Sequence, residues 1–292
     1  MAEICKEWSA PKKIGLLDKN ILPEASGIAL SKKYSDRLYH VNDSGNGSYF
    51  YITDSKGRNP RKILIKGYNS KGLDFEDIST GPCFFGDECI FIGDIGDNGL
   101  SREFIEVIII KESDDFGNSV KPDKRIKIKY PDGPHNAEGL AVHPNGDLYI
   151  VTKEADLENF KAYPSKVYRL SGGSIWRGNS EYYKPQHIGN IDLSKLEDNS
   201  LLILGQVLTG FDISDCGKRF LVLTYINAFE FDVDLSKVSG GENLKEGRIK
   251  VINLVPLSQQ ESISYINNSK AFIYDTEYID EEQKIMRVDC MD

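Results

Sequence analysis

One short pattern recurs along the chain. In it, apolar residues follow an acidic or small polar residue. The five copies occupy residues 26–29, 76–79, 138–141, 211–214 and 261–264. After each copy and a turn, a second apolar stretch follows, at residues 38–41, 90–93, 148–151, 220–223 and 271–274. Short apolar runs bounded by turn residues are typical of β-strands. The pattern therefore predicts five paired strands.

The spacing of the copies indicates the fold class. The central residues are separated by 50, 62, 73 and 50 positions and are Ile28, Ile78, Leu140, Ile213 and Ile263. Such a period is typical of a four-stranded unit that carries loop insertions. We expect an all-β chain, a single β-propeller of five four-stranded blades, with six blades as an alternative count. A β-sandwich whose strands only look alike remains the competing interpretation, and no segment shows helical periodicity.

The two ends of the chain complete this arrangement. The last unit ends one strand short, after residues 284–288, whereas residues 11–17 form a spare strand before the first copy. Pairing of these segments would complete the last blade and remove two sheet edges that could otherwise aggregate. We therefore expect residues 1–292 to form one domain and the protein to be a monomer.

Composition excludes several partners. The chain has 36 Lys plus Arg against 45 Asp plus Glu, for a net charge of −9. This acidic balance argues against binding to nucleic acid. No apolar run approaches the roughly 20 residues that a membrane helix requires. The N-terminus lacks a signal peptide, so the protein is either cytosolic or a mature exported chain.

The five cysteines bear on that choice. Ring closure would bring Cys5 close to Cys290, and Cys83 and Cys89 flank a short connection between two strands, which leaves Cys216 unpaired. Five reduced thiols in a cytosolic protein are the alternative. Two geometrically sensible pairs favour an oxidising compartment, so we expect a periplasmic or secreted protein.

Acidic and amide side chains concentrate where the first strand of each pair begins and the second strand ends. These two points share one rim of a propeller. The proposed oxygen ligands are Glu24, Asn42, Asp43, Glu76, Asp77, Asp94, Asp97, Asn98, Glu138, Asp212, Glu261 and Asp275, and Asp74, Glu154 and Glu277 stand at the same rim. Crowded carboxylates repel one another unless a cation offsets them. Oxygen ligands suit Ca²⁺ or Mg²⁺, although each acid could instead hold a loop together by accepting backbone hydrogen bonds.

Candidate catalytic residues lie at the same rim. Glu76 and Glu138 could act as general bases, His135 as a base or ligand, and Lys153 and Arg102 as partners of the acids or of an anionic substrate. No nucleophile elbow, phosphate loop, dinucleotide fingerprint or zinc-protease motif is present. Serine hydrolysis and nucleotide-driven chemistry are not expected.

Several motifs together resemble a family of exported bacterial propeller proteins without an assigned function, which is distantly similar to phytase-like and gluconolactonase-like propellers. The motifs include residues 41–45, 74–78, 93–98 with Arg102, 130–133, 137–140, 152–153 and 209–214. The resemblance implies a propeller and export. Because gluconolactonase-like propellers hold a catalytic divalent metal among Glu, Asn and Asp residues, it also makes a metal plausible. It assigns no reaction.

Two functional interpretations follow. In the first, the protein is an exported, non-catalytic propeller. The acidic rim around its central axis, which we call the funnel, binds a divalent cation together with a small molecule or a partner protein. In the second, the protein is a metal-dependent hydrolase of a phosphoester or a lactone, with a carboxylate as general base. The first is preferred, because the candidate residues show no diagnostic catalytic arrangement.

Overall fold

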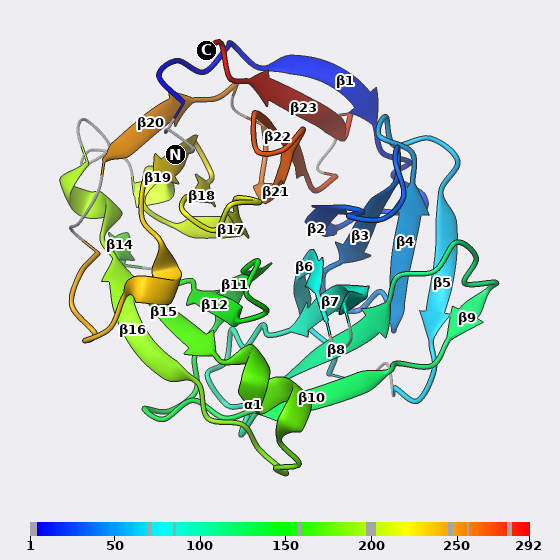
Figure 1. Ribbon diagram of the computed structural model, residues 1–292. Coiled ribbons are helices and arrows are strands. Elements are labelled where there is room, and N and C mark those ends of the chain that lie inside the picture. The colour runs from blue at the N-terminus through cyan, green and yellow to red at the C-terminus, as the bar shows by residue number, and fades with distance from the viewer. Residues whose placement is uncertain are drawn as a thin grey trace.

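The computed structural model describes residues 5–68, 72–83, 86–156, 159–196, 203–244, 248–255, 257–278 and 282–292. Five antiparallel sheets are arranged around a central axis as the blades of a propeller, which confirms the predicted fold (Figure 1). The innermost strand of each blade borders the axis. The fourth strand of each lies at the periphery.

Blades 1 to 3 follow one another along the chain, and the strands of each blade run in chain order from the axis outwards. Blade 1 contains β2 (Ala25–Leu30), β3 (Leu38–Asn42), β4 (Tyr49–Thr53) and β5 (Arg61–Ile65). Blade 2 contains β6 (Phe75–Pro82), β7 (Glu88–Asp94), β8 (Ile105–Lys111) and β10 (Lys124–Ile128). Blade 3 contains β11 (Ala137–Val142), β12 (Leu148–Thr152), β15 (Ser165–Leu170) and β16 (Gln186–Ile191).

The remaining elements are two blades and several short segments. Blade 4 contains β17 (Leu208–Ile213), β18 (Phe220–Thr224), β19 (Asn227–Phe231) and β20 (Ile249–Asn253). Blade 5 contains β21 (Gln260–Ile266), β22 (Ala271–Thr276), β23 (Lys284–Asp289) and β1 (Lys12–Leu16). The short segments are β9 (Ser119–Val120), β13 (Ala155–Asp156), β14 (Lys161–Ala162), α1 (Gly172–Arg177) and the 3₁₀ turns η2 (Leu193–Lys195), η4 (Ile203–Gly205) and η5 (Leu235–Lys237).

The N-terminal strand closes the ring, as predicted. β1 pairs antiparallel with β23, and Leu16 lies opposite Lys284. Blade 5 therefore takes three strands from the end of the chain and its outermost strand from the beginning. The disulfide Cys5–Cys290, with a Cα–Cα distance of 5.8 Å, joins the two ends. The second predicted pair, Cys83–Cys89, is also a disulfide, and Cys216 is free and exposed.

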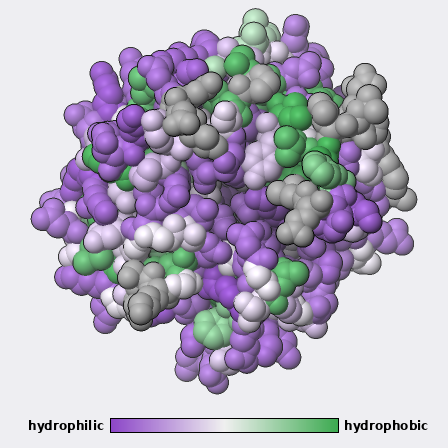
Figure 2. All heavy atoms as spheres, turned by 180° about the vertical axis from the view of Figure 1, so that it is seen from behind, coloured by the Kyte–Doolittle hydropathy of each residue, from purple (hydrophilic) through white to green (hydrophobic). Residues whose placement is uncertain are grey.

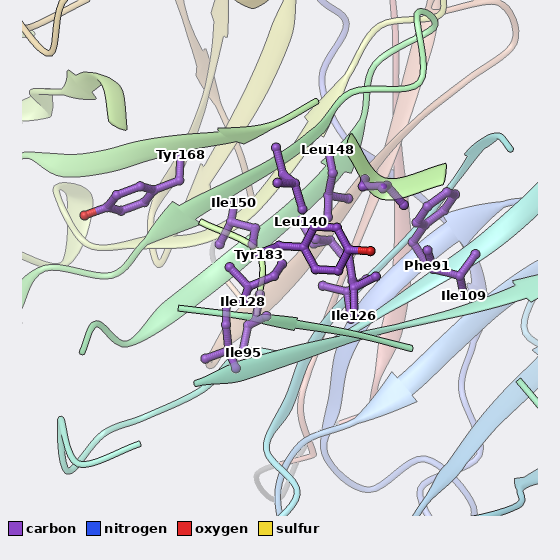
Figure 3. Packing of buried hydrophobic residues seen from close by; sticks show 14 of the residues in the cluster. Phe91, Ile95, Ile109, Ile126, Ile128, Leu140, Leu148, Ile150, Tyr168 and Tyr183 are labelled. Carbon is purple, nitrogen blue, oxygen red and sulfur yellow. The ribbon is translucent and has the colours of Figure 1, made fainter. Parts of the chain in front are cut away.

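Apolar packing holds neighbouring blades together. In the described part of the chain, the buried hydrophobic residues form five clusters, one at each junction between adjacent blades. Between blades 2 and 3, Phe91, Ile109 and Ile126 of one blade pack against Leu140 and Ile150 of the other (Figure 3). Burial of a large apolar side chain stabilises a fold by about 1.5–3 kcal/mol. Each blade depends on both of its neighbours for this burial.

Four outermost strands meet a backbone segment from the blade that follows. β9, in the connection between the third and fourth strands of blade 2, pairs parallel with β5 of blade 1. Tyr183 pairs in the same way with Ile128, and Asn243 with Asn190. The Leu16 N–H donates to the carbonyl of Lys56, at 3.2 Å. These contacts partly cover sheet edges that would otherwise be open to aggregation.

Two details differ from the sequence prediction. A helix, α1, forms in a connection where no helical periodicity is visible, because six residues are too few to show a period. In blade 4, Phe211 rather than Ile213 matches Ile28 of blade 1, since Phe211 pairs with Val222 as Ile28 pairs with His40. The alternation of apolar residues along a strand makes a shift of two residues invisible in the sequence.

Hydrophilic residues dominate the face seen from behind, where hydrophobic residues form only small separate groups (Figure 2). Among the helices that the structure describes, none has the length and apolar character needed to cross a membrane.

The terminal disulfide should stabilise the closed ring. Cys290→Ser should lower the free energy of unfolding by up to about 5 kcal/mol, because the bridge constrains nearly the whole unfolded chain. Cys216→Ser is the matched control and should change it by less than about 0.5 kcal/mol. Urea denaturation of both variants measures the difference. Equal stability of the two variants would contradict a role for the bridge in ring closure.

Candidate functional site

A β-bulge at the same place in each innermost strand positions the site. The pairing register of the first and second strands shifts near one end of every blade, and each shift leaves one additional residue on the inner strand. The bulged residues are Ser26, Glu76, Glu138, Thr209 and Glu261. Bulges commonly redirect a side chain near functional sites. Five equivalent side chains therefore come to one rim of the ring.

The five bulged residues divide into two groups. The hydroxyls of Ser26 and Thr209 each donate a hydrogen bond, of 2.8 Å, to a backbone carbonyl of the next blade, at Glu76 and Gln260. The other three residues are glutamates. Glu76, Glu138 and Glu261 are at most 5% exposed, so three acidic side chains are buried near the axis.

Asp94 and Asp212, two of the proposed oxygen ligands, do not occupy this repeat position. Asp94 ends the second strand of blade 2. Asp212 lies beyond the bulged Thr209 on the same strand, because the repeat of blade 4 is offset by two residues from the apolar pattern.

Asp43, Asp74 and Glu76 form the tightest acidic group. One carboxylate oxygen from each lies within 4.8 Å of the other two, and no other trio of carboxylates among the described residues does so. Oxygens that bind Ca²⁺ at 2.3–2.6 Å lie up to about 5 Å apart. The spacing of this group, which we call the acidic triad, fits a divalent cation.

Gly96 leaves room for the acidic triad. A Cβ atom at this position would overlap Oε1 of Glu76 and Oδ2 of Asp74. Only glycine therefore lets the loop after β7 approach the two carboxylates so closely. Residues 93–98 form one of the motifs in the sequence, but the motif did not show that this glycine makes space for acids.

A second group surrounds Lys153. Its ammonium donates hydrogen bonds of 3.0 Å to Oε1 of Glu138 and 3.0 Å to the Tyr225 hydroxyl. Asn136 also donates to Glu138, at 3.3 Å. Burial opposes the charge of Lys153, yet Glu138 and Glu261 raise its pKa above the ordinary value. Lys153 is therefore a permanent cation of the funnel.

In four of the five blades, the residue that follows the second strand also faces this region; in blade 2 this residue is Ile95, which belongs to the apolar core. These positions are Asp43, Lys153, Tyr225 and Glu277 in blades 1, 3, 4 and 5. Sequence reasoning missed Tyr225 and Asn136 because it considered mainly charged residues. Tyr225 could have been found by its repeat position.

Arg102 and its neighbours shape the loop that carries Gly96. The guanidinium donates 2.8 Å hydrogen bonds to Oδ1 of Asp94 and to the carbonyl of Gly96. Asp97 accepts two backbone N–H groups of the same loop, at Ser101 and Arg102. Asn98 accepts a hydrogen bond from Asn136. Asp94, Asp97 and Asn98 are predicted ligands, and in this structure they hold the loop in place beside the acidic triad.

Asp77 and Asp212 connect neighbouring blades. Oδ2 of Asp77 accepts the backbone N–H of Leu140 at 2.7 Å, and Oδ2 of Asp212 accepts that of Tyr265 at the same distance. Each also accepts the N–H of the residue that follows it. Both carboxylates thus satisfy backbone groups of two inner strands, which is the structural alternative considered for each acid.

The other predicted site residues are not members of the acidic triad. Asn42 donates to the carbonyl of Ile21, and the exposed Glu24 accepts from Asn46. Asp275 is fully buried, accepts from Ser262 and lies 3.9 Å from Nδ1 of His40.

His135 is held outside the funnel. Its Nε2 lies 3.3 Å from Asp132 and its Nδ1 lies 3.1 Å from Glu154. Both ring nitrogens therefore contact carboxylates away from the acidic triad.

Burial and like charges raise the pKa of most funnel acids. Burial, together with Glu138 and Asp43, holds the pKa of Glu76 well above its usual range. Burial and Glu138 do the same for Glu261. Burial and Asp43 raise the pKa of Asp74 to about 6 and that of Glu277 to about 7. The metal-free funnel therefore favours bound protons.

Stability without a divalent cation should fall as pH rises. In the unfolded chain these acids have pKa values near 4, whereas in the folded protein the pKa is about 6 for Asp74 and about 7 for Glu277. Between these pH values the folded state therefore binds more protons than the unfolded state. The unfolding free energy in EDTA should decrease from pH 5 to pH 8. Glu277→Gln should flatten this dependence, and an increase with pH would contradict it.

Asp77 should matter more for stability than Asp43. Asp77→Asn replaces an oxygen that accepts a backbone N–H by an amide donor, which should destabilise the fold by about 1–3 kcal/mol. Asp43→Asn removes one charge from the acidic triad and should be neutral or stabilising in metal-free buffer. Parallel urea titrations compare the two variants, and an equal loss of stability in both would show that Asp77 has no special role.

Comparisons with known proteins find similar structures but no similar sequence. No protein family model matches the chain, and no curated protein matches its sequence. The structure of the major allergen Mala s 1 of Malassezia sympodialis matches with a TM-score of 0.56 at 11% identity, over 96% of this chain and 97% of the allergen. A gluconolactonase from Xanthomonas campestris gives a TM-score of 0.48 at 13% identity, over 91% and 71%. A chain of a nidogen–laminin complex gives 0.47 at 16%, over 91% and 84%. The likeness to the allergen concerns the fold alone, and the five sheets of the chain form a β-propeller.

Proposed function

We propose that this protein is an exported propeller whose funnel binds a divalent cation, Ca²⁺ or Mg²⁺, at Asp43, Asp74 and Glu76, together with a ligand at the rim. The observation that carries the proposal is the spacing of the acidic triad, whose oxygens lie within 4.8 Å of one another. Carboxylate oxygens are the ligands that hard divalent cations prefer.

Electrostatics supports the proposal independently of spacing. Among the described residues, the cations near the acidic triad are Arg102 and Lys153. Lys153 already contacts Glu138. Arg102 is paired with Asp94. Arg102 lowers the pKa of Asp74 and Lys153 lowers that of Glu76, but among the described residues neither cation forms an ion pair with the acidic triad. A bound cation would supply that direct counter-charge.

Export is supported by the two disulfides. Such bonds persist in oxidising compartments and are rare in the cytosol. Cell fractionation tests this part of the proposal, and it should find the protein outside the cytosol. Thiol titration in denaturant without a reductant should find one thiol per chain, that of Cys216.

Calcium should raise the melting temperature. At a hundredfold excess over Kd, a ligand that binds only the folded state stabilises it by about 2.7 kcal/mol. Glu76→Gln should reduce the shift, because it removes a charged ligand. Gly96→Ala should also reduce it, because the added methyl group displaces Glu76 and Asp74.

Gly99→Ala is the matched control for this experiment. The nearest atom to a Cβ there is the Ser101 hydroxyl, at 3.5 Å, so this variant should keep the full calcium shift. If neither calcium nor magnesium moves the melting curve of the unmodified protein, the cation proposal fails.

Hydrolysis of a phosphoester or a lactone is the second candidate function. It is favoured by Glu138, a buried carboxylate that acts on Glu76 and could serve as a general base beside a cation held by the acidic triad. A bound divalent cation would supply Lewis acidity there. Turnover of a phosphoester or lactone that is lost in both Glu76→Gln and Glu138→Gln would support this function.

A further inference from the structure

The funnel holds more negative charge than one divalent cation offsets. Besides Asp94, which pairs with Arg102, six buried or half-buried carboxylates influence one another there, and they belong to Asp43, Asp74, Glu76, Glu138, Glu261 and Glu277. Lys153 supplies one positive charge. With every acid ionised, Lys153 and one divalent cation leave three negative charges without a partner. Unpaired buried charge is costly, so the funnel favours a further cation.

A second metal ion does not fit the remaining acids well. Within the described part of the chain, the acidic triad is the one carboxylate trio with metal-ligand spacing, and neither Glu261 nor Glu277 belongs to it. An ammonium group needs fewer protein oxygens, because it donates three hydrogen bonds in flexible directions. The excess charge therefore suits an organic cation better than a metal.

Glu261 provides a separate observation that indicates a ligand. Its side chain is 5% exposed, and Oε2 has no hydrogen-bond partner among the described residues. Buried carboxylate oxygens are nearly always hydrogen-bonded. Glu261 interacts with Glu138, Lys153, Glu277 and the Tyr225 hydroxyl, so its unpartnered Oε2 belongs to the funnel.

The neighbouring Glu277 connects this buried group with the rim. It follows β22, whose last residue, Thr276, lies opposite Gln260, the residue before Glu261. Glu277 is half-buried and accepts one hydrogen bond, of 2.7 Å, from Gln259. A ligand that enters at the rim would meet Glu277 first and Glu261 beneath it.

The same funnel already binds one ammonium group. Nζ of Lys153 lies 3.0 Å from a glutamate oxygen and 3.0 Å from the Tyr225 hydroxyl. The combination of a buried carboxylate with a neighbouring tyrosine is therefore suited to a primary amine in this environment.

We propose that the rim ligand is an organic cation whose ammonium group binds between Glu261 and Glu277, beside the divalent cation of the acidic triad. This inference rests on the proposed function, which supplies the divalent cation at the acidic triad. It extends that function by assigning the chemical class of the rim ligand. It distinguishes the funnel from a site for phosphate or carboxylate ligands, which the residual negative charge would repel.

Three five-carbon probes test the ligand class by isothermal titration calorimetry of the calcium-loaded protein. Cadaverine carries two ammonium groups, 1,5-pentanediol is neutral and glutarate carries two carboxylates. Cadaverine should bind at least tenfold more tightly than the other two. Equal or tighter binding of pentanediol or glutarate overturns the proposal.

Variants locate the binding site. Glu261→Gln should weaken cadaverine binding at least tenfold while the calcium-induced thermal shift persists, because the acidic triad is unchanged. Glu277→Gln should also weaken it, and it serves as a second variant if the buried substitution impairs folding. Asp114→Asn, which alters a side chain that is 89% exposed, should bind cadaverine like the unmodified protein. Wild-type affinity in both glutamine variants overturns the proposal.

The two proposals can fail separately. If calcium gives no thermal shift but cadaverine binds and depends on Glu261, the cation site is wrong and the ammonium site stands. If calcium gives its shift and cadaverine does not bind, the ammonium site is wrong and the cation site stands.

Discussion

The pairing of β1 with β23 is the interaction on which the rest of the structure depends. Each blade buries its apolar residues against two neighbours, so an open ring would leave two blades with exposed hydrophobic faces. Backbone pairing between residues 12–16 and 284–287 prevents this. Closure also holds the five inner strands at a common rim, and the funnel exists only because all five are present. Long-range closure thus determines both stability and the site.

The connections between the third and fourth strands form a second layer of organisation. In blades 1 to 4 these connections contact the outermost strand of the preceding blade through backbone groups. In blade 5 the corresponding connection is interrupted by the two chain ends. The disulfide Cys5–Cys290 lies at this interruption and restores covalent continuity. Its position is therefore explained by the architecture and not only by the proximity of two thiols.

Polar groups near the axis serve two purposes that compete for the same positions. Ser26, Thr209 and Asp77 satisfy backbone groups of the next blade and strengthen the ring. Glu76 and Glu261 have raised pKa values because burial and like charges oppose their ionisation. Residues of the second kind reduce stability at neutral pH when no cation is bound. Such an arrangement is typical of functional sites, where perturbed pKa values concentrate.

The sequence by itself predicted the strand pairs, five blades with six as the alternative count, the closing strand and both disulfide pairs, because periodic apolar residues and the position of the spare strand depend on local pattern. It also located the acidic rim. It could not separate Asp77, which bonds Leu140 of the next blade, from Glu76 beside it, since adjacent residues on a bulged strand face different partners. The two-residue shift in blade 4, the space beside Gly96 and the contact of Tyr225 with Lys153 were decided only by the tertiary structure, because each depends on distances between blades that are far apart in the chain.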